Sequence, residues 1–322
     1  MIRTLLRPFW NDDERRLRAP WRLVLGTVVY LAASLVVGVA ISRGGLLGAL
    51  GVQDPVVRRA VSTTFNGVIV LGSVAVAAVL LDRRLYADYG FGLGRDWWLD
   101  LGFGLALGAG LMTAVFLVEL AFGWVTVTGT FVAGGLGFAV EFGLVLYVFL
   151  WVGLYEELMT RGFVLTNLAE GFRLSWPVEV GRPVAVGLAT LLSSALFGVL
   201  HAANPNATVV SSVAIGVAGV MLALGYVLTG ELAIPIGLHV TWNLFQGAVY
   251  GFPVSGLGLD ASVVAVEQDG PRLLTGGAFG PEAGLIGLAA MVAGSVLTVG
   301  YVQWRYGGAE LAPIDLPALR WR

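Results

Sequence analysis

The segment Leu154–Arg161, LYEELMTR, places two adjacent carboxylates and an arginine directly after a long apolar run that begins at Phe138. A charge at membrane depth is costly, so an ionisable residue there indicates a functional site. On a helix, Glu157 and Arg161 are four residues apart and can pair. Glu156 points about 100° away from Glu157. One carboxylate can therefore be neutralised locally, which leaves the other for a different task.

The composition surrounding this segment is that of a membrane protein. Of 322 residues, 57% are hydrophobic and only 12% are charged, with a mean hydropathy of +0.84. Soluble globular chains carry roughly 25% charged residues. The apolar runs are too long for barrel strands and do not alternate, which excludes a β-barrel. The net charge of −2 gives no indication of a nucleic-acid partner. We therefore expect an all-α, polytopic membrane helix bundle with a central intramembrane cavity.

Three residue types are absent or rare, and this limits the possible chemistry. The chain has no Cys and no Lys, so all 19 basic residues are Arg. This excludes disulfides, thiolate zinc sites, a cysteine nucleophile and lysine-dependent mechanisms. The two histidines, His201 and His239, both lie in apolar segments. That placement indicates a role for both imidazoles.

The hydropathy pattern predicts about eight membrane-spanning helices and no soluble domain. We divide the chain into an Arg-rich interfacial leader (1–20), helices one to three (21–122), a core of helices four to seven (123–250), and a long loop with the last helix and tail (251–322). Residues 123–137 are expected to form a turn and residues 251–280 a Gly-rich loop. The expected spans are 21–42, 60–81, 98–122, 138–169, 184–202, 208–228, 232–249 and 284–304.

The arginines predict the orientation of this bundle. Counted over the alternating connections, 15 of the 19 lie on the side of the two termini and four lie on the other side. Because positive loops stay inside, both termini are expected in the cytoplasm. We therefore expect a multi-pass integral protein of the cell membrane.

Polar groups from three of the expected helices can form one site. Glu156 lies on the fourth helix, His201 on the fifth, and His239 and Asn243 share one face of the seventh. A buried carboxylate can accept a proton from water, an imidazole can orient that water, and a second imidazole with an amide can stabilise an oxyanion. The same residues also suit Zn²⁺, with Glu156, His201 and His239 as three ligands and an open position for water. Both versions remain open at this point.

These residues also carry a resemblance to a known family. The motif Glu-Glu-x-x-x-Arg at 156–161, followed by Phe-x-x-x-His at 197–201 and His-x-x-x-Asn at 239–243, resembles the CPBP family. This family comprises the CAAX proteases and the bacteriocin-processing, Abi-type intramembrane proteases, and the match is to the CAAX prenyl protease 2-like members. The resemblance implies an intramembrane endopeptidase that cleaves a peptide bond near the membrane surface.

The resemblance also implies roles for the residues. Glu156 would activate water, assisted by His201, while His239 and Asn243 would stabilise the oxyanion or join a metal-ligand set. Glu157 and Arg161 would form a supporting pair, and Phe197 would pack beside the site. The implied partners are the lipid bilayer and a membrane-associated peptide or protein substrate, which is prenylated in the prenyl-processing branch.

Two alternatives use the same buried cluster. A proton- or cation-coupled transporter would use the acidic and histidine side chains as a relay, and predicts inverted repeats with broken helices. A non-catalytic membrane scaffold would tolerate the loss of Glu156.

The rise per residue along the fifth and seventh expected helices places His201 and His239 at different depths in the membrane. This predicts a break in the fifth helix or an irregular start of the seventh near Pro235.

Overall fold

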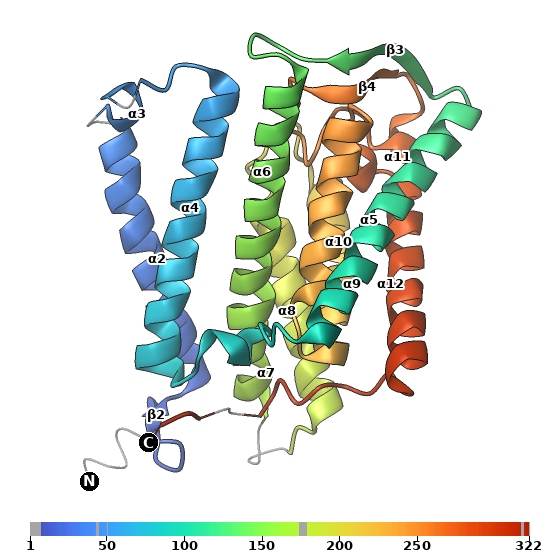
Figure 1. Ribbon diagram of the computed structural model, residues 1–322. Coiled ribbons are helices and arrows are strands. Elements are labelled where there is room, and N and C mark those ends of the chain that lie inside the picture. Colours follow the sequence, from blue (N-terminus) through green and yellow to red (C-terminus); the bar gives the residue numbers. More distant parts are fainter. Residues whose placement is uncertain (1–7, 43–44, 50, 174–178, 317–318, 322) are drawn as a thin grey trace.

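The computed structural model describes residues 8–42, 45–49, 51–173, 179–316 and 319–321. The described chain is a helical bundle, and seven of its helices are long and apolar enough to cross a membrane (Figure 1). The main helices are α2 (Ala19–Ser42), α4 (Pro55–Ala77), α5 (Arg95–Ala121), α6 (Phe138–Glu157), α8 (Arg182–Leu200), α9 (Val209–Thr229), α10 (Ala233–Asn243) and α12 (Leu285–Tyr306). This confirms the polytopic bundle expected from the sequence.

Helix α10 is the central element of the bundle. All 11 of its residues are buried, and a π-helical segment, η4 (Leu244–Val249), continues it. It packs against α5, where a Cβ on Gly104 would lie 2.4 Å from the Ile234 carbonyl oxygen and one on Gly108 would lie 2.4 Å from that of Leu238. Only glycine permits backbones to approach this closely. The two glycines therefore set the position of α10.

Helix α6 continues without a break past the end of the apolar run. A π-helical segment, η3 (Leu158–Leu165), and α7 (Thr166–Phe172) follow it, and together they form one apolar stretch of 35 residues. This length exceeds the roughly 20 residues that a span needs. The wider π-helical turn begins directly after Glu157, and such irregularities are frequent at functional sites.

Two predicted loops contain a β-ribbon, so that part of the prediction was wrong. Strand β3 (Val125–Val132) pairs antiparallel with β4 (Ser262–Gln268), with a register shift between Val127 and Gly129. The alternating valines and threonines of β3 favour a strand, but its partner lies more than 100 residues away in sequence. The ribbon ties the entry of α6 to the segment that follows α10. We call this end of the bundle the ribbon end.

The opposite end carries both termini, and we call it the terminal end (Figure 1). A short hairpin, β1 (Trp10–Asn11) and β2 (Arg16–Leu17), packs against it. Within the expected leader, Arg16 faces the protein, because it is 2% exposed and pairs with Glu170 at 2.8 Å. Arg22 and Arg84 also pair with Glu170, and burial lowers the pKa of the Arg16 and Arg84 guanidinium groups. Residues 1–7 of the predicted leader lie outside the described residues.

Candidate active site

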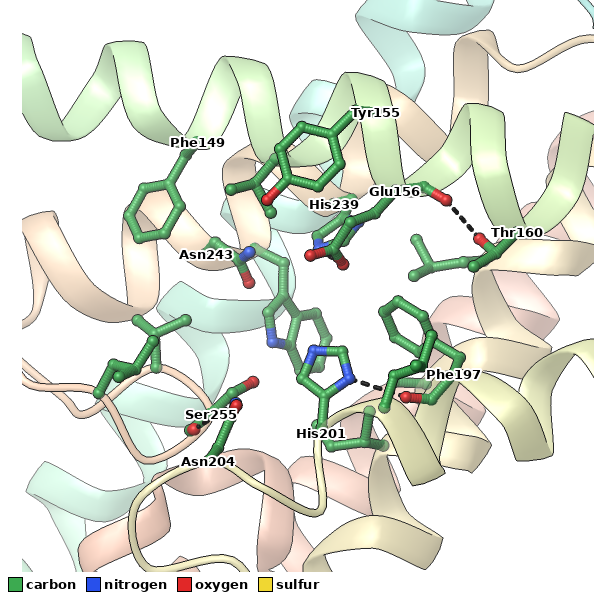
Figure 2. A pocket seen from close by; sticks show the side chains of 18 of the residues that line it. Phe149, Tyr155, Glu156, Thr160, Phe197, His201, Asn204, His239, Asn243 and Ser255 are labelled. Carbon is green, nitrogen blue, oxygen red and sulfur yellow. Dashed lines mark hydrogen bonds and ion pairs between the residues drawn. The ribbon is translucent and has the colours of Figure 1, made fainter. Parts of the chain in front are cut away.

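The predicted residues meet at a cavity of about 510 Å³ inside the bundle (Figure 2). Its walls come from α4, α6, α8, α9 and α10, and a segment between residues 254 and 259 covers part of it. Glu156, His201, His239 and Asn243 all line this space. The three motifs, separate in sequence, therefore lie around one space, as their chemistry requires.

Glu157 lies beside the cavity and holds two partners. Its Oε1 accepts a hydrogen bond from Nη1 of Arg161 at 2.9 Å and another from Nδ1 of His239 at 2.7 Å. Arg161 also donates to the Gly219 carbonyl oxygen at 3.0 Å. Glu157 and Arg161 are almost fully buried. The pair was predicted, whereas the contact of Glu157 with His239, 82 residues away, carries no signal in the sequence.

Glu156 is the carboxylate that faces the cavity. Its Oε2 lies 3.9 Å from Nε2 of His239, which is too long for a hydrogen bond but suits a bridging water. The same oxygen is buried and has no hydrogen-bond partner among the described residues. The side chain of Glu156 is 23% exposed, whereas that of Glu157 is fully buried. The predicted division between one paired and one free carboxylate is therefore present.

His201 lies across the cavity from Glu156 (Figure 2). It caps the end of α8, and its Nδ1 is 2.8 Å from the Phe197 carbonyl oxygen, one turn earlier. Because that carbonyl can only accept, Nδ1 is the protonated nitrogen of the neutral ring. This leaves the lone pair of Nε2 for other partners.

The Phe197 ring lies between the other groups of the site. Its centre is 4.7 Å from the ring of His201 and 6.0 Å from that of His239. The Arg161 guanidinium lies over its face at 4.6 Å, within the range of a cation–π interaction. Phe197 therefore does more than pack beside the site, because it contacts both imidazoles and covers the buried arginine.

The expected irregular helices are not observed. Helix α8 runs unbroken from Arg182 to Leu200, and Pro235 lies in the first turn of α10, where a helix tolerates proline. Both histidines nevertheless line the cavity, because His201 stands toward its ribbon end and turns back to Phe197. His201 and His239 can therefore lie at different depths in the bundle and still line the same cavity, without a break in α8.

Asn243 completes the predicted set. It lies one turn after His239 on α10 and is 8% exposed. Figure 2 shows its amide beside His239 and directed into the open space. It can therefore reach a group bound next to Glu156.

Sequence reasoning missed three polar residues at the ribbon end of the cavity. The Ser255 backbone N–H donates to Glu282 at 2.7 Å and its hydroxyl donates to the same carboxylate at 3.2 Å. The Asn204 amide donates to the Ser255 carbonyl oxygen at 3.0 Å. Burial raises the pKa of the Glu282 carboxyl. These contacts join three segments that no local pattern connects, and they hold the covering segment in place.

The three residues expected as zinc ligands do not converge on one point. In the part of the chain that the structure describes, no group of three His, Cys, Asp or Glu side chains is placed to hold a metal ion. Within the described chain, each histidine keeps its Nε2 free of hydrogen bonds, as a metal ligand would, but His201 lies on the far side of the cavity from Glu156. In this arrangement Glu156, His201 and His239 do not fit a three-ligand zinc site.

Taken together, the fold and the cavity define an integral membrane protein built as a helical bundle around an ionisable site. Residues 137–245 match the model of the family described as type II CAAX prenyl endopeptidase Rce1-like. The match is consistent with the CPBP family of CAAX proteases and indicates a protease of the CAAX type, acting on a membrane-associated peptide. No curated protein and no solved structure matched the chain. The matched segment runs from the start of α6 into η4 and contains all the candidate site residues named from the sequence.

Proposed function

We propose that this protein is a glutamate-dependent intramembrane endopeptidase in which Glu156 activates the attacking water. The observation that carries the proposal is the unpartnered Oε2 of Glu156, buried at the cavity and 3.9 Å from Nε2 of His239. A general base needs a free acceptor within reach of a water. Glu157, by contrast, binds Arg161 and His239 through its Oε1, and its Oε2, which has no partner among the described residues, is buried away from the cavity lining.

The chemical step follows from these positions. The Glu156 carboxylate takes a proton from water, and the oxygen of that water attacks the carbonyl carbon of the peptide bond. The lone pair on Nε2 of His201 orients the same water from the other side of the cavity. The tetrahedral intermediate collapses, the C–N bond breaks, and the proton held by Glu156 passes to the departing amine. The base thus becomes the acid of the second half-reaction.

His239 and Asn243 stabilise the negative charge on the carbonyl oxygen. Because Nδ1 of His239 donates to Glu157, its Nε2 donates only when the ring is an imidazolium. The Glu157 carboxylate is the counter-charge that stabilises this form. The Asn243 amide supplies a second donor from the same helix face. Removing one such donor typically lowers kcat by about 10²–10³.

The apolar lining suggests which substrate to test first. Beyond the polar groups, Val70, Val152, Met159, Met221 and Leu222 line the cavity. This surface suits a lipid chain attached to the peptide, so a prenylated CAAX-type peptide is the first candidate. We further propose that the protein is a multi-pass protein of the cell membrane with both termini in the cytoplasm.

The test uses purified full-length protein in lipid nanodiscs and a fluorogenic CAAX-type peptide, with and without a farnesyl group. Glu156→Gln removes the proton acceptor and should lower the cleavage rate by about 10²–10⁴. Glu231→Gln, a change outside this cavity, should leave the rate unchanged. Full activity of Glu156→Gln would overturn the proposal. Ion-dependent flux in liposomes without cleavage would favour a transporter.

A further inference from the structure

Arg59 is a charged residue of the cavity that the proposed chemistry does not use. It lies near the start of α4, which begins at the ribbon end (Figure 1). Among the described residues that line the cavity it is the single arginine, and the chain has no lysine. The carboxylates that line the same space are Glu156 and Glu282. An anion that enters the cavity therefore meets one permanently positive side chain.

The Arg59 guanidinium is held in place but is not neutralised. Its Nη1 and Nη2 both donate to the Gly258 carbonyl oxygen at 3.3 Å, which is longer than most such bonds. In the part of the chain that the structure describes, Arg59 forms no ion pair with a carboxylate. Gly258 lies between Leu257 and Leu259 of the covering segment, and both leucines line the cavity. The half-exposed guanidinium thus keeps donors for an anion at the ribbon end of the cavity.

One face of α4 leads from Arg59 to the depth of the candidate catalytic carboxylate. Arg59, Thr63 and Asn66 follow one another at helical spacing, and all three line the cavity. Asn66 lies next to Tyr155, the residue before Glu156. Seven residues separate Arg59 from Asn66, which corresponds to about 10 Å along the helix axis.

This distance corresponds to a short piece of peptide. An extended chain spans at most about 3.3–3.6 Å per residue, so about three residues cover it. The Thr63 hydroxyl and the Asn66 amide lie along the path, and they suit the backbone N–H and C=O groups of an extended peptide. A carboxylate bound at Arg59 would thus follow the cleaved bond by about three residues.

The apolar lining lies on the other side of Glu156. Val70 is one turn past Asn66 on the same face of α4, and Met159 is three residues past Glu156 on η3. A lipid chain carried before the cleaved bond would contact these residues, while the charged end of the peptide lies at Arg59. The cavity therefore has an apolar end and a cationic end, with Glu156 between them.

We propose that Arg59 binds the terminal carboxylate of the substrate and so determines which peptide bond reaches Glu156. A terminal carboxylate is favoured over an acidic side chain, because a chain that continued past Arg59 would meet Leu257 and Leu259. A planar guanidinium also matches a carboxylate with two parallel hydrogen bonds. The proposal rests on the proposed endopeptidase function and gives that function a residue that determines its specificity.

The test compares two forms of one peptide in variants of the full-length protein in nanodiscs. A farnesylated peptide with three residues after the cleaved bond is made with a free carboxylate and with a terminal amide. The unaltered protein should cleave the acid with a kcat/KM about 10–100-fold above that of the amide. In Arg59→Gln the two values should become equal, mainly through a higher KM for the acid. Arg59→Lys should keep part of the preference, because it keeps the charge but not the paired donors.

Arg58→Gln is the matched control, because Arg58 is exposed and does not line the cavity. It should keep the full preference for the acid. The rate with the amide in each variant is the internal control for folding. If Arg59 only holds the covering segment, Arg59→Gln will slow the acid and the amide equally, and that result would overturn the proposal. An unchanged preference in Arg59→Gln would also overturn it.

Two further sets of peptides test the position of the carboxylate. A terminal amide with glutamate as its last residue should be cleaved as slowly as the plain amide, and cleavage as fast as the acid would overturn the assignment to the chain terminus. Acids with two to five residues after the cleaved bond should be cleaved fastest at three, and equal rates would contradict the distance argument.

The two proposals fail in different ways. Equal cleavage of acid and amide by the unaltered protein would remove the role of Arg59 and leave the endopeptidase function standing. If no peptide is cleaved and Glu156→Gln is indistinguishable from the unaltered protein, the endopeptidase function fails, and the role of Arg59 fails with it.

Discussion

Nδ1 of His239 lies 2.7 Å from Oε1 of Glu157, and the same oxygen accepts a hydrogen bond from Arg161 at 2.9 Å. Oε1 of Glu157 thus connects the Arg161 guanidinium of η3 to the His239 imidazole of α10. Because Glu157 is held in this way, Glu156 is free to face the cavity. Two adjacent residues of the same type therefore have different surroundings, and their variants should behave differently.

The first prediction compares these two glutamates. Glu157→Gln leaves the buried Arg161 without its counter-charge, a loss that typically costs about 3–5 kcal/mol. We expect a clear fall in the thermal unfolding midpoint of the detergent-solubilised protein. Glu156→Gln removes no ion pair with Arg161 and should unfold near the temperature of the unaltered protein. Equal midpoints for the two variants would contradict the assigned division of roles.

The second prediction concerns the contact between α5 and α10. In Gly108→Ala the new Cβ would lie 2.4 Å from the Leu238 carbonyl oxygen, next to His239. Overpacking of this kind costs about 1–3 kcal/mol, and it should move α10 and reduce cleavage. Gly110→Ala is the matched control, because on the same helix its Cβ meets nothing within 4 Å. Loss of activity in Gly110→Ala alone would show that α5 acts in another way.

The third prediction concerns metal. Because the candidate ligands do not converge, a strong zinc chelator such as 1,10-phenanthroline should leave cleavage unchanged in nanodiscs. Elemental analysis of the purified protein should give no stoichiometric zinc. Inhibition by the chelator that added Zn²⁺ reverses would instead favour a metal-dependent enzyme, and would require Glu156, His201 and His239 to move together.

The fourth prediction concerns the dependence of stability on pH through Glu282. Burial raises the pKa of this carboxyl above its ordinary value of 4.5, so the folded protein holds the proton at pH values where the unfolded chain has released it. The contribution of Glu282 to stability therefore falls as pH rises above 4.5. Glu282→Gln lacks this titration.

The measurement for Glu282 is the thermal midpoint of both proteins across the mildly acidic range. The midpoint of the unaltered protein, taken relative to Glu282→Gln, should decrease toward neutral pH. A constant difference would show that the carboxyl titrates alike in the folded and unfolded chains. The two hydrogen bonds from Ser255 partly offset the cost of burying this carboxyl.

The sequence predicted the bundle and the meeting of the candidate residues at one cavity for the same reason. Long apolar runs are a local property, and charged or imidazole groups within them are few enough to be assigned a shared role. His201, His239, Glu156 and Asn243 could therefore be placed together before any geometry was known.

Contacts between distant segments could not be predicted in the same way. The pairing of β3 with β4 joins two strands more than 100 residues apart, and the local pattern of neither strand identifies its partner. The bonds of Ser255 to Glu282 and of Glu157 to His239 arise only once the helices have packed. The burial of Arg16 likewise depends on Glu170, which lies near the end of α7.

The i,i+4 pair of Glu157 and Arg161 has a consequence for the biogenesis of the protein. When this helix enters the lipid, α8, α9 and α10 have not yet packed against it, so Gly219 and His239 are not in place to receive its charges. Because Arg161 and Glu157 are on the same helix and lie 2.9 Å apart in the folded chain, we expect them to enter the bilayer as a neutral unit. Glu156 is then the one charged group of the motif without a partner on its own helix, until the later helices pack against it. The supporting ion pair thus serves the nascent chain first and the finished site afterwards.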